Sequence, residues 1–172
     1  MDEDRSINEV EKTFEQESAF YLESSSELNM CIDHIVSLLV DARILFDAGS
    51  YARTISLAIV TLEEVGKTQI ALFTHKPESE YVKHDPLRDH KTKQIIGSNY
   101  TISMGTRLVE AIGEEMLEHI YSLSYNGKLK TMREQMLYWD CDSGNILLPE
   151  KIANYDFAKA LLLFAIESFD DN

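Results

Sequence analysis

Apolar residues recur at steps of three and four along a segment in the first half of the chain, and this spacing limits what the chain can fold into. The series consists of Tyr51, Ile55, Ile59, Leu62, Gly66, Ile70 and Phe73. Residues at these steps share one side of an α-helix, which has about 3.6 residues per turn. The pattern therefore predicts a long helix over about residues 50–74.

The same segment contains Gly66-Lys67-Thr68, which matches the end of a phosphate-binding loop. Such a loop needs a second glycine five positions earlier, and a strand before it. Thr61 occupies that earlier position, and the residues before it have helical rather than strand spacing. We therefore expect no nucleotide cofactor. Because glycine inside a helix costs about 1 kcal/mol relative to alanine, Gly66 is expected to permit close helix packing.

A second helix is predicted immediately before the first. Its apolar positions are Leu28, Ile32, Ile35, Leu39, Ala42 and Phe46. Three serines at 24–26 followed by Glu27 are typical of a helix start, and Gly49 is typical of a helix end. Two long helices joined by so short a turn must pack antiparallel.

Further helices are predicted in the second half. Asp85 followed by Pro86 predicts a helix that starts at Pro86, because aspartate caps a helix and proline suits its first turn. This helix is expected to break near Gly97 and to resume from Met104 to Ile120. Another is expected over about residues 150–169.

A change of pattern between these last helices predicts a β-hairpin. Residues 137–139 and 146–148 are apolar or aromatic and flank the turn-forming sequence DCDSGN. The expected fold class is all-α, a bundle of four to five helices with one small β-hairpin near the C-terminal third.

Composition predicts one domain preceded by an acidic arm. The chain has 172 residues, 44% of them hydrophobic, and a net charge of −14. Residues 1–28 hold nine acids and two bases, so residues 1–25 are expected to form an acidic arm, possibly helical, before a domain over 26–172. The charge opposes binding to nucleic acid and anionic membranes, except at a local basic site. The chain has only two cysteines and an acidic N-terminus, and both features favour the cytoplasm. We expect no membrane association.

Metal chemistry is not supported by the spacing of the histidines. A di-iron helical bundle needs glutamate and histidine three residues apart, and none of the five histidines has a glutamate three residues before it. Glu115 and His119 lie four apart, but a single pair is weak evidence. We expect no metal site and no cofactor.

The polar side of the long helix leaves two interpretations open. Glu63 and Glu64 lie four and three residues before Lys67, so either can form an ion pair with it. In the first interpretation this is an exposed pair that contributes less than about 1 kcal/mol. In the second, neighbouring helices partly bury the pair, and Arg88, His90 or Lys93 supplies further partners.

Three blocks of sequence resemble the AbiV-like abortive-infection family, which has a HEPN-type helical bundle. They are LFDAGSYARTISLAIVTLEEVGKTQIAL, LRDHKTKQ and KLKTMREQMLYWDCDSGNILLPEKI, and they fall within residues 28–155. The positions that match are Glu63, Glu64, Gly66, Lys67, His90, Lys91, Lys93, Lys130, Arg133, Leu137, Tyr138, Asp140, Gly144 and Pro149.

The resemblance implies a role in phage defence, and HEPN domains typically act as homodimers. Many are metal-independent ribonucleases that carry an arginine four to six residues before a histidine. This chain departs from that pattern, because a single residue separates Arg88 from His90 and the arginines at 53, 107 and 133 have no histidine at the required distance. Whether the protein is an enzyme is therefore left open.

The function expected is anti-phage activity by binding a phage or host protein, or RNA, so that translation or RNA use is blocked without catalysis. The alternative is a metal-independent ribonuclease with His90 as the base and Arg88 among the phosphate contacts, in which Glu64 orients a cation or the histidine. The expected binding residues are Glu63, Glu64, Lys67, Lys91, Lys93, Lys130, Arg133 and Tyr138.

Overall fold

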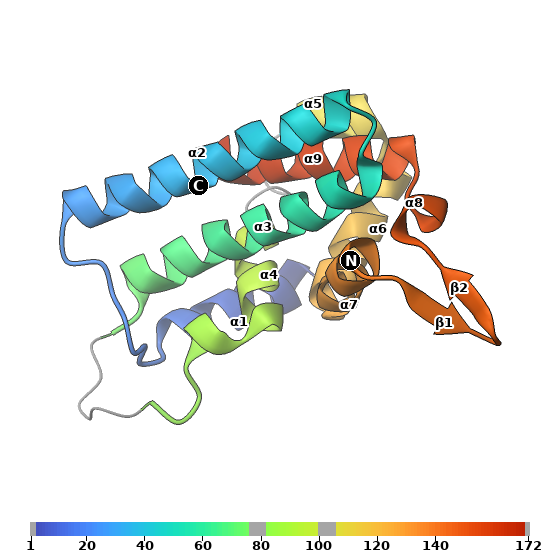
Figure 1. Cartoon of the computed structure of the whole chain (residues 1–172). Helices are drawn as coiled ribbons and strands as arrows, with labels where there is room; N and C mark the ends of the chain where they lie inside the picture. Colours follow the sequence, from blue (N-terminus) through green and yellow to red (C-terminus); the bar gives the residue numbers. More distant parts are fainter. Residues whose placement is uncertain (1–2, 76–81, 100–105, 171–172) are drawn as a thin grey trace.

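Helix α3 (Tyr51–Phe73) runs through the middle of the computed structural model, which describes residues 3–75, 82–99 and 106–170. Fourteen of its 23 residues are buried, so neighbours must cover it on most sides. In Figure 1, α2 (Ser25–Asp47) lies along one side of α3, while α1 (Glu3–Phe14) and α4 (His90–Asn99) lie on the other. The prediction of an all-α bundle is confirmed.

The remaining elements complete the bundle. They are the 3₁₀ turn η1 (Pro86–Arg88), α5 (Thr106–Ile112), α6 (Glu114–Tyr125), α7 (Lys128–Leu137), β1 (Asp140–Asp142), β2 (Asn145–Leu147), α8 (Pro149–Ile152) and α9 (Tyr155–Asp170). The main core lies between α3, α6, α7 and α9, with Ile59, Leu62, Ile120, Leu161 and Phe164 fully buried in it. No helix among the described residues is both long enough and apolar enough to cross a membrane.

The antiparallel pair of α2 and α3 is present as predicted. The Ser24 side chain accepts a hydrogen bond from the Glu27 amide, and the Glu27 side chain accepts one from the Ser24 amide. This reciprocal cap fixes the start of α2. Gly49, with φ +75°, turns the chain into α3, because a positive φ costs glycine little.

Helix α1 packs against α3 and α4 through a small apolar cluster. Val10 contacts the fully buried Ile70 and Ile96, with Phe14 and Leu87 at the edge. Beyond α1 the chain bonds to the end of α3, where the Leu22 amide donates to the Ala71 carbonyl at 2.8 Å. The proposed boundary between an arm and a domain at residue 25 stays a prediction.

The helix expected from Pro86 begins instead at His90. The Asp85 carboxylate accepts from the Leu87 amide and starts only a single 3₁₀ turn. The Asp89 carboxylate then accepts from the amides of Lys91 and Thr92, both at 3.2 Å, and from the Thr92 hydroxyl at 2.6 Å. A second capping aspartate therefore restarts the chain as α4.

Helix α4 ends at Asn99, close to the break expected near Gly97. Two other predicted helices are each divided. Gly113 has φ +83°, so the expected helix is divided into α5 and α6; its first residue, Met104, lies outside the described residues. The last helix is divided at Asn154, whose side chain accepts from the Phe157 amide at 2.9 Å and starts α9.

Replacing Asp89 with alanine is expected to lower the free energy of unfolding by about 1 kcal/mol, the usual cost of losing a helix cap. Burial alone would raise the pKa of Asp89, but the hydrogen bonds from Thr92 and the Lys91 amide and the charge of His90 outweigh it and lower the pKa. The stabilisation is therefore present above the ordinary aspartate pKa and is lost as pH falls through the lower folded value. Urea unfolding of wild type and Asp89→Ala at about pH 7 and about pH 3 checks this: the difference should shrink in acid. Asp89→Asn is the control, because it keeps a capping oxygen without the charge.

The predicted hairpin is confirmed, although its strands lie closer to the turn than expected. Asp140 pairs with Leu147, Cys141 with Ile146 and Asp142 with Asn145. Ser143 and Gly144 form the turn with φ values of 51° and 84°. Two successive positive φ angles give the turn type whose twist suits a two-residue hairpin.

Candidate functional site

A buried glutamate, Glu63 of α3, joins three helices. Its Oε2 lies 2.9 Å from His90 Nδ1 at the start of α4, and Arg133 of α7 donates to the same oxygen at 2.8 Å. Its Oε1 accepts from Gln94 Nε2 at 2.7 Å. We call these four residues the Glu63 cluster.

Local structure explains why these side chains meet. His90 and Gln94 are four residues apart in α4, so they lie on the same side of that helix. Helix α4 crosses α3 closely at Gly66 and Gly97, and this crossing brings its first turn to Glu63. Ser56 of α3 donates to the backbone carbonyl of Arg133 at 3.2 Å, which positions α7.

The Glu63 cluster pairs opposite charges in a place that is largely shielded from solvent. The side chain of Glu63 is 5% exposed and that of Arg133 17%, whereas His90 is 36% exposed. A buried charge is tolerated when it is paired and hydrogen-bonded, as Glu63 is. Arg133 therefore neutralises Glu63, and His90 reaches from this pair toward solvent.

The contact with Glu63 also orients the imidazole of His90. An ionised carboxylate only accepts hydrogen bonds, so His90 Nδ1 donates to Glu63 and Nε2 becomes the nitrogen that can accept a proton. Carboxylates orient the histidine in this way in hydrolytic active sites. The arrangement is thus compatible with a base, and it serves equally as a fixed polar contact for a partner.

The two open interpretations of the glutamates apply to different residues. Glu64 forms the exposed pair, with its Oε2 3.0 Å from Lys67 Nζ and side chains 23% and 46% exposed. Glu63 is the buried residue and contacts His90 rather than Lys67. Glu64 therefore contacts a cation, Lys67, and the glutamate that contacts His90 is Glu63. Glu64 and Lys67 line a separate pocket of about 550 Å³.

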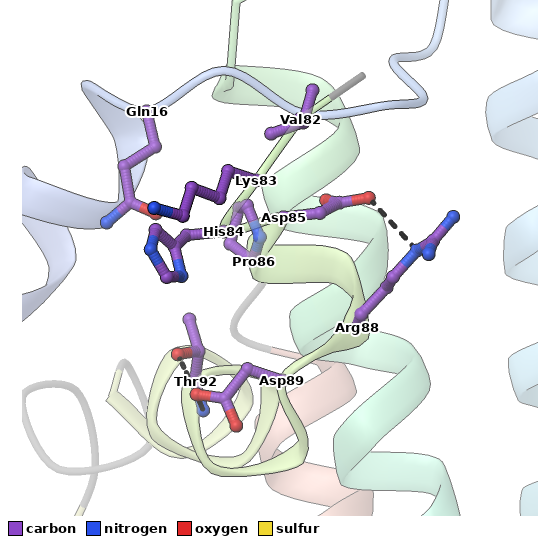
Figure 2. Close-up of a pocket in the computed structure, with 9 residues that line it drawn as sticks. All are labelled: Gln16, Val82, Lys83, His84, Asp85, Pro86, Arg88, Asp89 and Thr92. Carbon is purple, nitrogen blue, oxygen red and sulfur yellow. Dashed lines mark hydrogen bonds and ion pairs between the residues drawn. The ribbon is translucent and has the colours of Figure 1, made fainter.

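Arg88 lies apart from the Glu63 cluster. Its side chain is 81% exposed, with Nε 3.7 Å from Asp85 Oδ2. In Figure 2 it points away from Lys83 and His84, which lie on the other side of a polar pocket of about 480 Å³. The guanidinium that shares an oxygen with His90 is that of Arg133.

The other residues expected to bind a partner are distributed around this site. Lys91 is exposed beside Gly127, Lys93 is buried within α4, and Lys130 is exposed on α7. Tyr138 is 67% exposed and lines a pocket of about 470 Å³ together with Val60, Arg133, Glu134 and Leu137. Arg133 therefore connects the Glu63 cluster to the surface at the end of α7.

Gln94 is the member of the Glu63 cluster that sequence reasoning missed. It is fully buried, and its amide holds the second oxygen of Glu63. The available signal was its position one helical turn after His90.

Within residues 3–75, 82–99 and 106–170, no group of three or more His, Cys, Asp or Glu side chains is placed to hold a metal ion.

Comparison with known proteins supports the resemblance seen in the sequence. A family profile of the HEPN type, described as AbiV, matches residues 24–169. The match includes all four members of the Glu63 cluster and the hairpin. No curated protein and no solved structure matches the chain.

Proposed function

Because the chain belongs to the AbiV family, we propose that it is an abortive-infection protein that binds a protein or RNA partner and so blocks translation or RNA use without cutting RNA. The proposal includes action in the cytoplasm as a homodimer, as expected from the sequence and its resemblance. The family membership supports the general role. The chemistry of the Glu63 cluster supports the non-catalytic mode.

The observation that carries the non-catalytic mode is the shared oxygen of Glu63. Arg133 and His90 both contact Oε2, at 2.8 and 2.9 Å. A guanidinium that stabilises a developing charge on phosphate must direct its N–H groups at the substrate. That of Arg133 donates from Nη1 to the buried Glu63 carboxylate, which neutralises its charge, and Arg88 is paired with Asp85. The cluster is therefore better suited to hold helices and present a fixed surface.

A ribonuclease remains the second candidate because of the orientation of His90. Its Nε2 can take the proton of a ribose 2′-hydroxyl, and the resulting oxygen attacks the adjacent phosphorus. The bond to the 5′-oxygen of the next nucleotide then breaks, and that oxygen takes up a proton. The products would be a 2′,3′-cyclic phosphate and a free 5′-hydroxyl, with no metal required.

Incubation of purified protein with total cellular RNA, with and without a divalent metal, separates the two candidates. We expect intact RNA with wild type, with His90→Ala and with His84→Ala, which removes a solvent-exposed histidine outside the Glu63 cluster. Discrete cleavage by wild type and His84→Ala, but not by His90→Ala, would overturn the non-catalytic mode. Circular dichroism of each variant confirms that loss of activity is not loss of fold.

A further inference from the structure

The hairpin of β1 and β2 projects from the end of the bundle, at the right of Figure 1. All six residues of its strands are exposed. A two-stranded hairpin is at best marginally stable alone, and a third strand or a packed face stabilises it. A binding partner that pairs with or packs against the projecting hairpin would therefore stabilise it.

Large apolar side chains are concentrated around this hairpin. Tyr138 is 67% exposed, Trp139 66% and Ile146 68%. The same region exposes Leu137, Leu147, Leu148, Ile152 and Tyr155. Exposed apolar side chains gathered in one segment of the chain are typical of interaction sites, and tryptophan and tyrosine are prominent among residues that dominate binding energy.

The open edge of β1 carries charges that select what can pair with it. Asp140 and Asp142 lie on one face of the hairpin, and Cys141 lies on the other, opposite Ile146. The Cys141 amide, which faces the open edge, donates to the neighbouring Asp140 carboxylate at 2.7 Å, and the carbonyl of an added strand must displace this local bond. Antiparallel pairing of β1 with a second copy, centred on Cys141, would set Asp140 against Asp142, and like charges directly opposite destabilise a sheet.

The surrounding charge has the same sign. Residues 137–156 contain four acids and one base, within a chain of net charge −14. One of these acids, Glu150, already lies 3.5 Å from Arg53. Acidic side chains in a segment that also exposes apolar ones repel phosphate and complement a partner with basic side chains.

We propose that the β1 edge and its aromatic neighbours bind an extended, basic segment of a partner protein, which adds to the hairpin as a third strand. Lysine or arginine side chains of the segment lie opposite Asp140 and Asp142, and an apolar side chain lies opposite Cys141. The proposal rests on the partner-binding function above but uses a surface separate from the Glu63 cluster. It assigns the protein partner a chemistry: alternating basic and apolar residues.

A fluorescein-labelled peptide of alternating lysine and valine is the probe, and fluorescence anisotropy measures its affinity for the full chain. Replacing both Asp140 and Asp142 with asparagine should weaken binding at least about tenfold, because it removes two direct charge partners. Asparagine keeps a side-chain oxygen that can accept the hydrogen bond from the Cys141 amide. The matched control replaces Asp33 and Asp41, exposed on α2, with asparagine and should change the affinity less than about twofold. A peptide of alternating glutamate and valine should not bind.

Several results would overturn the proposal. Equal weakening by the two double variants would show that net charge alone attracts the peptide, and absence of binding to wild type would remove the site. A dimer in light scattering that is lost on Ile146→Asp would make a second copy the occupant. Binding of a uridine oligonucleotide that is lost on Trp139→Ala would make RNA the occupant. The RNA cleavage assay tests His90 and not the hairpin. The proposed function and the hairpin proposal can therefore fail independently.

Discussion

Alanine in place of Gly66 is expected to lower the free energy of unfolding by roughly 3 kcal/mol or more, the upper end of what an overpacked core costs. A methyl group there would lie 2.8 Å from the Gly97 amide nitrogen and closer still to the Lys93 carbonyl oxygen. Both are backbone atoms, so no side chain can move aside, and α3 and α4 must separate. The Glu63 cluster, which spans this crossing, would then be disrupted as well.

Urea unfolding followed by far-ultraviolet circular dichroism measures the effect. The matched control is Gly49→Ala, where an added methyl group meets nothing within 4 Å but the backbone φ is +75°. That change should cost only about 1–2 kcal/mol, the penalty of a positive φ for a residue with a β-carbon. If Gly66→Ala proved no more destabilising than Gly49→Ala, the close crossing of α3 and α4 would be wrong.

Removal of the Glu63 charge is the second large effect expected. Glu63→Gln leaves the Arg133 guanidinium, 17% exposed, without its carboxylate. Breaking one half of a buried ion pair typically costs about 3–5 kcal/mol, because the remaining charge is uncompensated. Glu64→Ala, one residue further along, removes an exposed pair with Lys67 and should cost less than about 1 kcal/mol.

A double variant separates the charge from the packing. Adding Arg133→Met to Glu63→Gln removes the stranded guanidinium and should recover part of the lost stability, as in other buried pairs replaced by apolar groups. The same unfolding measurement applies. Equal costs for Glu63→Gln and Glu64→Ala, or no recovery in the double variant, would contradict the buried pairing.

The helices with strong local signals could be predicted from the sequence. The start of α2 depends on Ser24 and Glu27, and its end depends on Gly49, all within a few residues of the boundaries they set. The hairpin turn likewise depends on its own residues, Ser143 and Gly144. The helix expected from Pro86 had a second candidate cap at Asp89, and the local pattern alone does not determine which of the two begins the α-helix.

Most residues of the candidate site could be named from the sequence, but which of them contact one another could not. Adjacent positions on a helix differ by about 100° in direction, so the helical spacing alone does not determine whether Glu63 or Glu64 faces α4. The contacts of Glu63 span 27 residues of sequence to His90 and 70 to Arg133. Spacing rules along the chain cannot identify partners so distant. Arg88 was expected to act with His90 although the two lie only two residues apart, and its side chain lies away from the Glu63 cluster.

The projecting hairpin also has an optical consequence. Trp139 is the only tryptophan in the chain, and it is 66% exposed beside β1 rather than in the helical core. Intrinsic tryptophan emission therefore originates at the hairpin and depends little on the packing of α3 against its neighbours. A partner that covers β1 would move this indole from water into an apolar contact and shift its emission to shorter wavelength. The chain thus carries a built-in reporter at the surface where the partner segment is proposed to bind.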